Sequence, residues 1–381
     1  MRYPSIADLR ECARRRIPNF AFEYIDSGTG DDRTLERNRD ALDRVLFIPE
    51  ILHGKRDCTL GVSVLDHDWD LPVGVAPVGM SGLMWPGAER RLARAARAHN
   101  IPYCLSSVAA ASPEEIAPHA GHTAWFQLYV PASRDICTDI IRRVHDSGYQ
   151  ALVLTVDVPA PSRRERQRRA GMGYPPKLSL RLLLEMLLHP SWSLAMAREG
   201  TPSLKLLESY VENARRHQDR FIHIGRMIQG CPDWQSIADI RQIWERKLIV
   251  KGVQRPEDGL RLRDAGVDAV WVSNHGGRQF DAGPASIAML RGVRAAVGPD
   301  YPVLFDSGIA GGLDVMRALA CGADMAFLGR GFHYAVAALG DRGVAHLLHL
   351  LRAELVSGMA QIGAFEFGDL ASRLANDSLP D

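Results

Sequence analysis

The sequence predicts a parallel (β/α)8 barrel, and three observations support this prediction. Eight short apolar runs, rich in β-branched residues or bounded by Gly and Pro, recur along the 381-residue chain. Helix-like segments follow most of these runs, and polar side chains gather at their carboxyl ends. Strands that alternate with helices are typical of a parallel sheet, and eight such units close a barrel. An open doubly wound sheet is the alternative.

The expected elements follow one another with a regular spacing. The strands are expected at Leu71–Pro77, Ile101–Ser107, Ala124–Val130, Ala151–Asp157, Lys247–Val253, Ala269–His275, Pro302–Gly308 and Met325–Arg330. The helices are expected at Gly87–His99, Pro113–His119, Ser133–Ser147, Pro256–Ala265, Pro284–Val297 and Leu313–Cys321. Pro256 and Pro284 each fit the first turn of a helix, where a missing N–H costs nothing.

Segments outside this rhythm complete a single expected domain over residues 1–381. Residues 1–70 form an extension that looks helical at first, over Pro4–Arg16 and Phe20–Ser27. The barrel then spans 71–340, and 341–381 form a C-terminal helical region. Residues 158–233 are too many for an ordinary loop, so we expect a lid, an excursion or a partner surface there.

The excursion contains a leucine-rich helix, expected over Leu178–Leu188 and ended by Pro190. Its apolar density, with arginines at 163–169, suits a helix that lies in a membrane interface. This pattern suggests peripheral membrane contact through 177–199. The alternative, slightly favoured, is a helix packed on its own barrel or on another subunit.

Composition and charge exclude several classes of protein. The chain is 46% hydrophobic and 24% charged, which is ordinary for a globular protein. Its net charge of +1 gives no general attraction to nucleic acid. The six cysteines form no CxxC pair or zinc spacing, so we expect neither disulfides nor a metal site. The first 16 residues lack the apolar segment of a signal peptide, and the cytoplasm is the expected compartment.

One loop offers both a proton acceptor and an anion clamp. It runs from Ser273 to Gln279 and carries His275 and Arg278 beside two glycines. A His can move a proton near neutral pH, and an Arg can hold a carboxylate through two parallel hydrogen bonds. A surface turn with a solvated His and Arg is the alternative. The pattern favours an enzyme that acts beside a carboxylate.

Two further Gly-rich loops predict a phosphate site. Residues 306–312 follow the seventh strand and Gly329-Arg330-Gly331 follow the eighth, the position where barrels commonly bind phosphate. Because the carboxylate clamp lies on another loop, the phosphate is expected to belong to a cofactor. Lys251, at the end of the fifth strand, then either stabilises negative charge on the cofactor ring or forms a salt bridge at the barrel mouth.

These motifs resemble the FMN-dependent L-2-hydroxy acid dehydrogenase and oxidase family, which includes L-lactate dehydrogenase, (S)-mandelate dehydrogenase and glycolate oxidase. The resemblance runs from about Tyr3 to about Gly340. It rests on the Ser273–Gln279 loop, on Thr155–Pro159 followed by 163–165, on Gln127-Leu128-Tyr129, and on Tyr24 before Ser27-Gly28.

The resemblance implies oxidation of a small L-2-hydroxy acid to the 2-oxo acid by FMN. It implies that His275 takes the substrate proton, that Asp157 supports His275, and that Lys251 stabilises reduced flavin. Substrate binding would fall to Arg164, Arg278, Tyr24 and Tyr129, with Tyr129 also in the catalytic group. The FMN-binding positions would be Ala76, Pro77, Val78, Ser106, Gln127, Thr155, Lys251, Ser273, Asp306, Gly308, Gly329 and Arg330.

The chain departs from the family pattern at three places. Ala310 replaces a usual Arg near the flavin, Val108 replaces an aromatic residue of glycolate oxidase, and Ser162 replaces a common Gly before two arginines. Two alternatives to an oxidising enzyme stay open: a non-redox flavin barrel like type 2 isopentenyl diphosphate isomerase, and a catalytically silent flavin protein.

The resemblance also leads to expectations about partners. The stretch 79–86 is similar to the bacterial lactate and mandelate dehydrogenases, so we expect electrons to pass to a quinone or to O2. The expected location is cytoplasmic, with peripheral contact at the inner face of the plasma membrane as a hypothesis. Relatives suggest a homotetramer.

Overall fold

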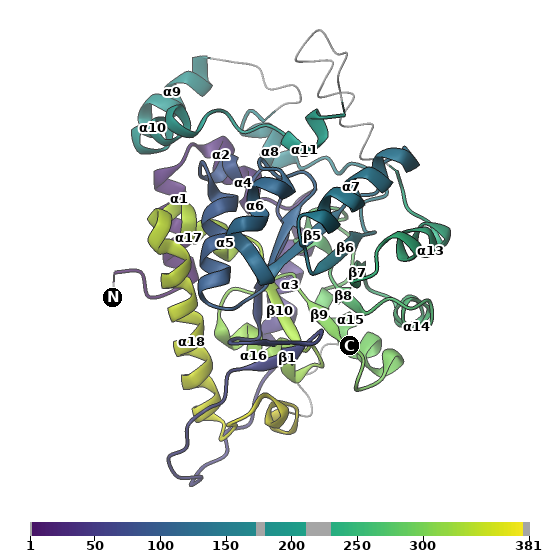
Figure 1. Ribbon diagram of the computed structural model, residues 1–381. Helices are drawn as coiled ribbons and strands as arrows, with labels where there is room; N and C mark the ends of the chain where they lie inside the picture. The colour runs from purple at the N-terminus through teal and green to yellow at the C-terminus, as the bar shows by residue number, and fades with distance from the viewer. Residues whose placement is uncertain (1, 173–179, 211–229, 376–381) are drawn as a thin grey trace.

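The computed structural model describes residues 2–172, 180–210 and 230–375. Eight parallel strands close into a barrel in the order β10-β3-β4-β5-β6-β7-β8-β9 (Figure 1). The strands are β3 (Val73–Val75), β4 (Tyr103–Ser106), β5 (Ala124–Leu128), β6 (Ala151–Thr155), β7 (Lys247–Val253), β8 (Ala269–Val272), β9 (Val303–Phe305) and β10 (Met325–Leu328). Each lies within a range predicted from the sequence, and the closed barrel excludes the doubly wound alternative.

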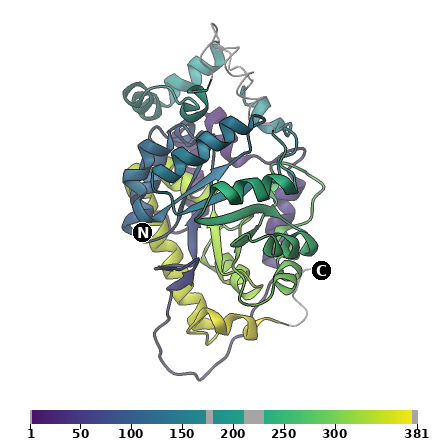
Figure 2. The ribbon, with the colours of Figure 1, turned by 45° about the vertical axis from the view of Figure 1, so that its right-hand side comes forward.

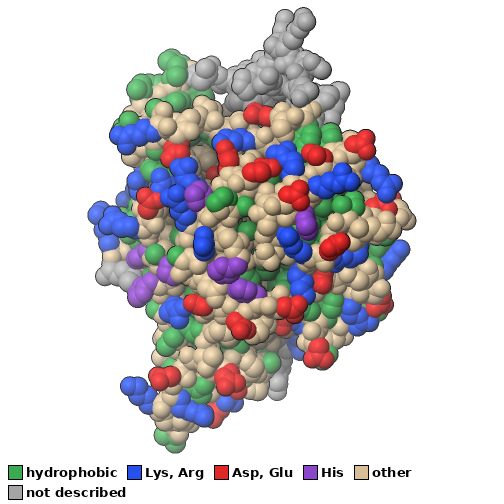
Figure 3. Space-filling model, in the orientation of Figure 1, with side chains coloured by type: hydrophobic (Ala, Val, Ile, Leu, Met, Phe, Trp, Pro, Cys, Tyr) green, Lys and Arg blue, Asp and Glu red, His purple; other side chains and the backbone are tan. Residues whose placement is uncertain are grey.

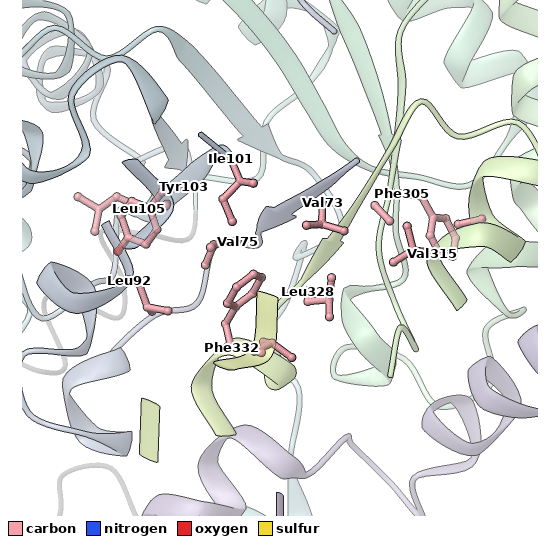
Figure 4. Packing of buried hydrophobic residues seen from close by; sticks show 14 of the residues in the cluster. Val73, Val75, Leu92, Ile101, Tyr103, Leu105, Phe305, Val315, Leu328 and Phe332 are labelled. Atoms are coloured by element: carbon pink, nitrogen blue, oxygen red, sulfur yellow. The ribbon is translucent and has the colours of Figure 1, made fainter. Parts of the chain in front are cut away.

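Helices surround the barrel and bury one face against it. They are α4 (Ser81–Met84), α5 (Ala88–Ala98), α6 (Pro113–Ala120), α7 (Arg134–Asp146), α13 (Trp234–Ile243), α14 (Pro256–Asp264), α15 (Ser286–Val297), α16 (Gly312–Ala320) and α17 (Arg330–Leu339), with the short turns η1 (Gly121–Thr123) and η2 (His275–Gly277). Figure 4 shows Leu92 and Phe332, from two of these helices, beside the strand residues Val75 and Leu328. The apolar faces of helix and strand therefore form one continuous core.

One predicted helix start is wrong. Pro284 lies before α15, because the helix begins at Ser286 with Ala285 as its N-cap residue. The Pro284 carbonyl instead accepts a hydrogen bond from Asn274 Nδ2 at 2.9 Å. Pro256 does occupy the first turn of α14, as predicted.

The N-terminal extension is only partly helical. Its helices α1 (Ile6–Arg16), α2 (Asn19–Asp26) and α3 (Arg33–Asp43) are followed by a hairpin of β1 (Val62–Val64) and β2 (His67–Trp69). Trp69 of this hairpin packs edge-on against Trp125, with 6.1 Å between ring centroids, and so closes the amino end of the barrel. The C-terminal region forms α18 (Gly343–Gln361), which packs on α16 and α17, and the turns η3 (Gly340–Arg342) and η4 (Phe367–Arg373).

The excursion after β6 contains α8 (Glu165–Arg169), α9 (Leu180–Leu188), α10 (Pro190–Glu199) and α11 (Lys205–Glu208). Both ribbon views show α9 and α10 at the top of the molecule, projecting beyond the barrel (Figures 1 and 2). Trp192 anchors α10, because its Nε1 donates to the Leu83 carbonyl at 3.1 Å. Pro190 follows the end of α9, as predicted, but also opens α10. Residues 177–179 of the predicted membrane segment lie outside the described residues.

Candidate active site

Lys251 holds a buried polar network at the mouth of the barrel. Its Nζ donates to Ser273 Oγ at 2.6 Å and lies 2.9 Å from Asp306 Oδ2. Ser273 Oγ in turn donates to Asp306 Oδ1 at 2.6 Å. These three residues come from the ends of β7, β8 and β9, so the predicted convergence of strand ends is present. The salt bridge considered for Lys251 forms, and it keeps a cation fixed in a buried position.

His275 and Asp157 form a second pair beside this network. His275 Nδ1 lies 3.0 Å from Asp157 Oδ1, so the ionised carboxylate favours the tautomer with its proton on Nδ1. Nε2 is then an unprotonated base. Burial lowers the pKa of His275, and the charge of Asp157 opposes this effect. Burial favours the neutral acid of Asp157, but the charges of His275 and Lys251 lower its pKa overall.

Gly252 makes room for Asp157. The pairing of β7 with β8 shifts register between Lys251 and Val253, and Gly252 takes a φ of 106° at this irregularity. A Cβ at position 252 would lie 2.6 Å from the Cβ of Asp157. The glycine therefore allows the backbone of β7 to approach the carboxylate that supports His275.

Two tyrosines line the same region. Tyr129 OH lies 3.4 Å from His275 Nε2, and burial and the charge of Asp157 raise the pKa of this phenol. Tyr24 OH donates to the Gly79 carbonyl at 2.9 Å. Burial raises the pKa of Tyr24, although the charges of two nearby arginines oppose the shift. Both phenols therefore stay protonated and can donate hydrogen bonds at neutral pH.

Three arginines converge here without a carboxylate partner. Arg164, Arg278 and Arg330 form no ion pair within the described part of the chain. Arg278 donates to the carbonyls of Tyr24 and Ser27 at 2.8 Å each, and Arg330 also contacts the Ser27 carbonyl, at 3.2 Å. Burial and the charges of Arg164 and Arg330 lower the pKa of Arg278 well below its usual range. Such an excess of partly buried positive charge favours anion binding.

Ser162 has a direct role in holding Arg164. Arg164 lies just before α8 with a φ of 46°, and its Nε donates to Ser162 Oγ at 3.0 Å. Its backbone N–H contacts Thr29 Oγ1 at 3.3 Å. The departure from the family pattern at 162 therefore supplies an additional hydrogen bond to the guanidinium.

Two backbone N–H groups of the loop after β9 are already occupied by carboxylates. Ala310 N donates to Asp314 Oδ2 at 2.8 Å, and Gly312 N donates to the Glu354 carboxylate. Arg39 of α3 donates to the Gly308 carbonyl at 2.7 Å and pairs with Asp314. The guanidinium of Arg39 therefore places a positive charge at this loop, although position 310 is Ala. The carboxylate of Asp314 neutralises that charge.

Comparison with known proteins identifies the family. Residues 13–377 match the family model described as FMN-dependent dehydrogenase. The chain belongs to the FMN-dependent dehydrogenase family. It is similar to a monotopic membrane (S)-mandelate dehydrogenase, with 34% identity, a TM-score of 0.93, and 98% of this chain and 99% of the other covered.

Two further solved structures agree with this family. A mandelate oxidase variant with (S)-mandelic acid has 34% identity, a TM-score of 0.81 and 98% coverage of both chains. A soluble mutant of the membrane-associated (S)-mandelate dehydrogenase from Pseudomonas putida has 31% identity and a TM-score of 0.84, with 98% and 99% of the two chains covered. The protein is thus an FMN-dependent enzyme that oxidises 2-hydroxy acids, and the non-redox alternative is not favoured.

The residues of this FMN-dependent dehydrogenase suit a flavin. Gln127 Nε2 and Thr155 Oγ1 are buried at the ends of β5 and β6, and neither has a hydrogen-bond partner among the described residues. A buried polar group left unpaired costs about 1–3 kcal/mol, so both groups call for a ligand. The carbonyl and nitrogen atoms of an isoalloxazine ring are matching partners. Ser106 Oγ donates to Gln127 Oε1 at 2.7 Å and so orients the Gln127 amide.

The remaining predicted cofactor positions lie next to one another. Ala76, Pro77 and Val78 follow β3, and Ala76 N donates to the Leu328 carbonyl of β10 at 3.1 Å. A Cβ on Gly329 would lie 3.3 Å from Val78 Cγ2, so the loops after β3 and β10 approach closely. Arg330 Nε and Nη2 donate to backbone carbonyls, while Nη1 donates no hydrogen bond within the described residues.

The groups that hold these loops in place are not predicted by any sequence motif. Asn38 and Asn274 exchange two amide hydrogen bonds of 2.7 and 2.9 Å, and thereby tie α3 to the loop that carries His275. Asp26 accepts hydrogen bonds from three separate elements. Because the partners are up to 308 residues apart, no local pattern in the sequence marks them.

Proposed function

We propose that His275 takes a proton from an L-2-hydroxy acid of the lactate or mandelate type. The observation that carries the proposal is the setting of His275. Asp157 holds its Nδ1, and among the described residues its Nε2 contacts only the Tyr129 hydroxyl, at 3.4 Å. Arg164, which has no carboxylate partner among the described residues, lies close enough to help lower the pKa of His275. A base beside unneutralised guanidinium groups matches a substrate that carries its reacting C–H next to a carboxylate.

In this proposal each side chain has one task. Arg164 and Arg278 bind the substrate carboxylate, and Tyr24 and Tyr129 donate hydrogen bonds to substrate oxygens. Asp157 holds the His275 ring and stabilises its protonated form after proton transfer. FMN, when bound, supplies the electron-accepting chemistry. Lys251 keeps a positive charge at the barrel mouth, where it favours negative charge on a bound ring.

The substrate side chain is expected to contact the loops after β3 and β4. A Cβ at Gly79 would lie 2.5 Å from Val108 Cγ2, so these two residues form a close wall beside Tyr24. We expect the L enantiomers of lactate or mandelate to yield the 2-oxo acid, and the D enantiomers to remain unreacted. Product formation from a panel of both enantiomers measures this, and a preference for the D series would contradict the arrangement.

The dependence of kcat/KM on pH follows from the lowered pKa of His275. The base must be neutral, so activity falls as the pH drops through a value below the ordinary 6.5 and stays level above it. Asp157→Asn removes the charge that raises this pKa. We therefore expect the acid limb of the profile to move to lower pH in Asp157→Asn, together with a lower rate. A limb that moves to higher pH would contradict the assigned pair.

We also propose that α9 contacts a membrane surface. Its outer face presents Leu180, Leu183, Leu184, Leu187 and Leu188, whose exposed fractions lie between 47% and 76%. Their spacing places them on one face of the helix. Figure 3 shows hydrophobic side chains at the projecting upper corner where Figure 1 places α9 and α10. No helix among the described residues is long and apolar enough to span a bilayer.

A vesicle flotation assay tests this surface. Wild-type protein is expected to float with phosphatidylcholine–phosphatidylglycerol vesicles, and Leu183→Ser/Leu184→Ser/Leu187→Ser is expected to remain in the dense fractions. The matched control is Leu260→Ser/Val356→Ser, which removes two exposed aliphatic side chains from α14 and α18 and should still float. Equal flotation of all three proteins would contradict the proposal that α9 contacts a membrane surface.

The remaining proposals concern the electron acceptor and assembly. We propose that residues 1–381 form one catalytic domain, that it acts at the cytoplasmic face of the plasma membrane, and that it passes electrons to a quinone or O2. We further propose a homotetramer, in which the exposed Ile48, Ile51 and Leu52 become covered. Light scattering in detergent gives the oligomeric state, and parallel assays with O2 and a soluble quinone give the acceptor.

A further inference from the structure

Asp26, at the C-terminal end of α2, is a buried node that joins four parts of the chain. Its side chain is 4% exposed. Arg10 of α1 donates to it through Nε at 2.5 Å and Nη2 at 2.9 Å. Tyr334 OH of α17 donates at 2.7 Å, and Arg166 Nη2 of α8 donates at 2.8 Å. Three elements therefore fix the last turn of α2.

The two residues beside Asp26 present carbonyls that the site arginines share. The Ile25 carbonyl accepts from Arg278 Nη1 at 3.2 Å and from Arg330 Nε at 3.0 Å. The Ser27 carbonyl accepts from Arg278 Nη1 at 2.8 Å and from Arg330 Nη2 at 3.2 Å. Because the last carbonyls of a helix lack helical partners, they are free to hold guanidinium groups.

The third site arginine is connected to the same node along the chain. Arg166, a partner of Asp26, lies two residues after Arg164, and it also pairs with Glu23 and Asp32 at 2.8 and 2.7 Å. The start of α8 is thereby fixed to α2. A displacement of Asp26 would therefore affect Arg278 and Arg330 through the two carbonyls and Arg164 through Arg166.

We propose that Asp26 is a positioning residue that holds the three arginines of the active site in the arrangement needed for anion binding. The proposal rests on the proposed function for the roles of Arg164 and Arg278. Asp26 does not itself touch the substrate, because its carboxylate is occupied by Arg10, Tyr334 and Arg166. Its negative charge also offsets part of the positive charge that the three arginines bring together.

The protonation state of Asp26 agrees with this role. Burial favours the neutral acid, but hydrogen bonds from Arg10, Tyr334 and Arg166 outweigh burial and lower the pKa to about 2. The carboxylate is therefore ionised at every pH at which the enzyme would work, and the node is permanent rather than switched by pH.

Anion affinity of the FMN-loaded protein tests the proposal without relying on turnover. Oxalate, a small dicarboxylate, is titrated into wild type and Asp26→Asn, and binding is followed through the flavin absorbance. We expect Asp26→Asn to bind oxalate about ten- to hundredfold more weakly, since each of several charge-assisted contacts is weakened. The control Asp268→Asn removes a carboxylate that Arg241 binds at the other end of the barrel, and should bind oxalate normally.

A second readout separates positioning from general damage. For any 2-hydroxy acid that wild type oxidises, Asp26→Asn should raise KM far more than it lowers kcat, because His275 and Asp157 are untouched. Arg10→Gln and Tyr334→Phe, which each remove one partner, should give intermediate losses of oxalate affinity and serve if Asp26→Asn does not fold. Wild-type oxalate affinity in folded Asp26→Asn, or in both of these variants, would overturn the proposal. Failure of wild type to oxidise any 2-hydroxy acid would instead count against the proposed function alone.

Discussion

His275→Gln is expected to retain FMN and lower the rate of flavin reduction by substrate about 10³-fold, since a positioned base contributes roughly 10²–10⁴. Gln has a similar size and can still hydrogen-bond Asp157, but it cannot accept the substrate proton. The assay is anaerobic stopped-flow reduction at saturating substrate. FMN content and thermal stability should match wild type, because within the described residues the ring hydrogen-bonds only Asp157 and Tyr129.

The matched control for His275→Gln is His145→Gln. His145 also lies beside an aspartate, at 3.4 Å from Asp146, but on the outside of the barrel. The His145→Gln variant should reduce its flavin at the wild-type rate. Fast flavin reduction in His275→Gln would show that another group takes the proton, and Tyr129 would be the next candidate.

Arg278→Lys is expected to weaken substrate binding by about 2 kcal/mol, roughly thirtyfold in KM, because a charge-assisted hydrogen bond contributes about 1.5–3 kcal/mol. Lysine keeps a positive charge but lacks the planar fork that can hold a carboxylate and backbone carbonyls at once. In this chain the fork also donates to the carbonyls of Tyr24, Ile25 and Ser27, so lysine loses these contacts as well.

Steady-state kinetics and product-analogue binding measure the effect of Arg278→Lys. Arg134→Lys, on the exposed face of α7, provides the control and should leave KM unchanged. If Arg278→Lys binds substrate as tightly as wild type, Arg164 must hold the carboxylate alone. The pair Arg164→Lys and Arg278→Lys would then separate the two contributions.

The barrel could be predicted from the sequence because its signal is local. Each strand is a short apolar run, and its burial requires no information from distant residues. Lys247–Val253 and the other seven predicted ranges each contain the observed strand. Pro284 was wrongly predicted to lie in the first turn of a helix, because the sequence pattern is the same for a proline just before a helix and for a proline in its first turn. The β1–β2 hairpin was missed because its strands are only three residues long.

The site was predictable for a different reason. Parallel strands bring their carboxyl ends to one face, so Lys251, Ser273 and Asp306 were expected to meet although 55 residues separate the first and the last. Their roles toward substrate and flavin remain predictions. The supports around them could not be foreseen, because Asp26 with Tyr334 and Asn38 with Asn274 depend on how helices pack rather than on any short motif.

The exposure of α9 shows where local pattern and packing differ. The sequence allowed a helix buried on its own barrel, but the structure directs only part of α9 inward, with Leu182 and Met186 against the core. The other face is not covered by any of the described residues.

The most direct test of the central claim is the visible spectrum of the purified protein during anaerobic addition of L-lactate or L-mandelate. The account predicts a yellow, FMN-loaded protein whose absorbance bleaches with one of these acids and yields one equivalent of the 2-oxo acid. A yellow, folded protein that no L-2-hydroxy acid bleaches would contradict the assignment of His275, Arg164 and Arg278. A protein that takes up no FMN would contradict the cofactor site itself and direct attention to Ala310 and Glu354.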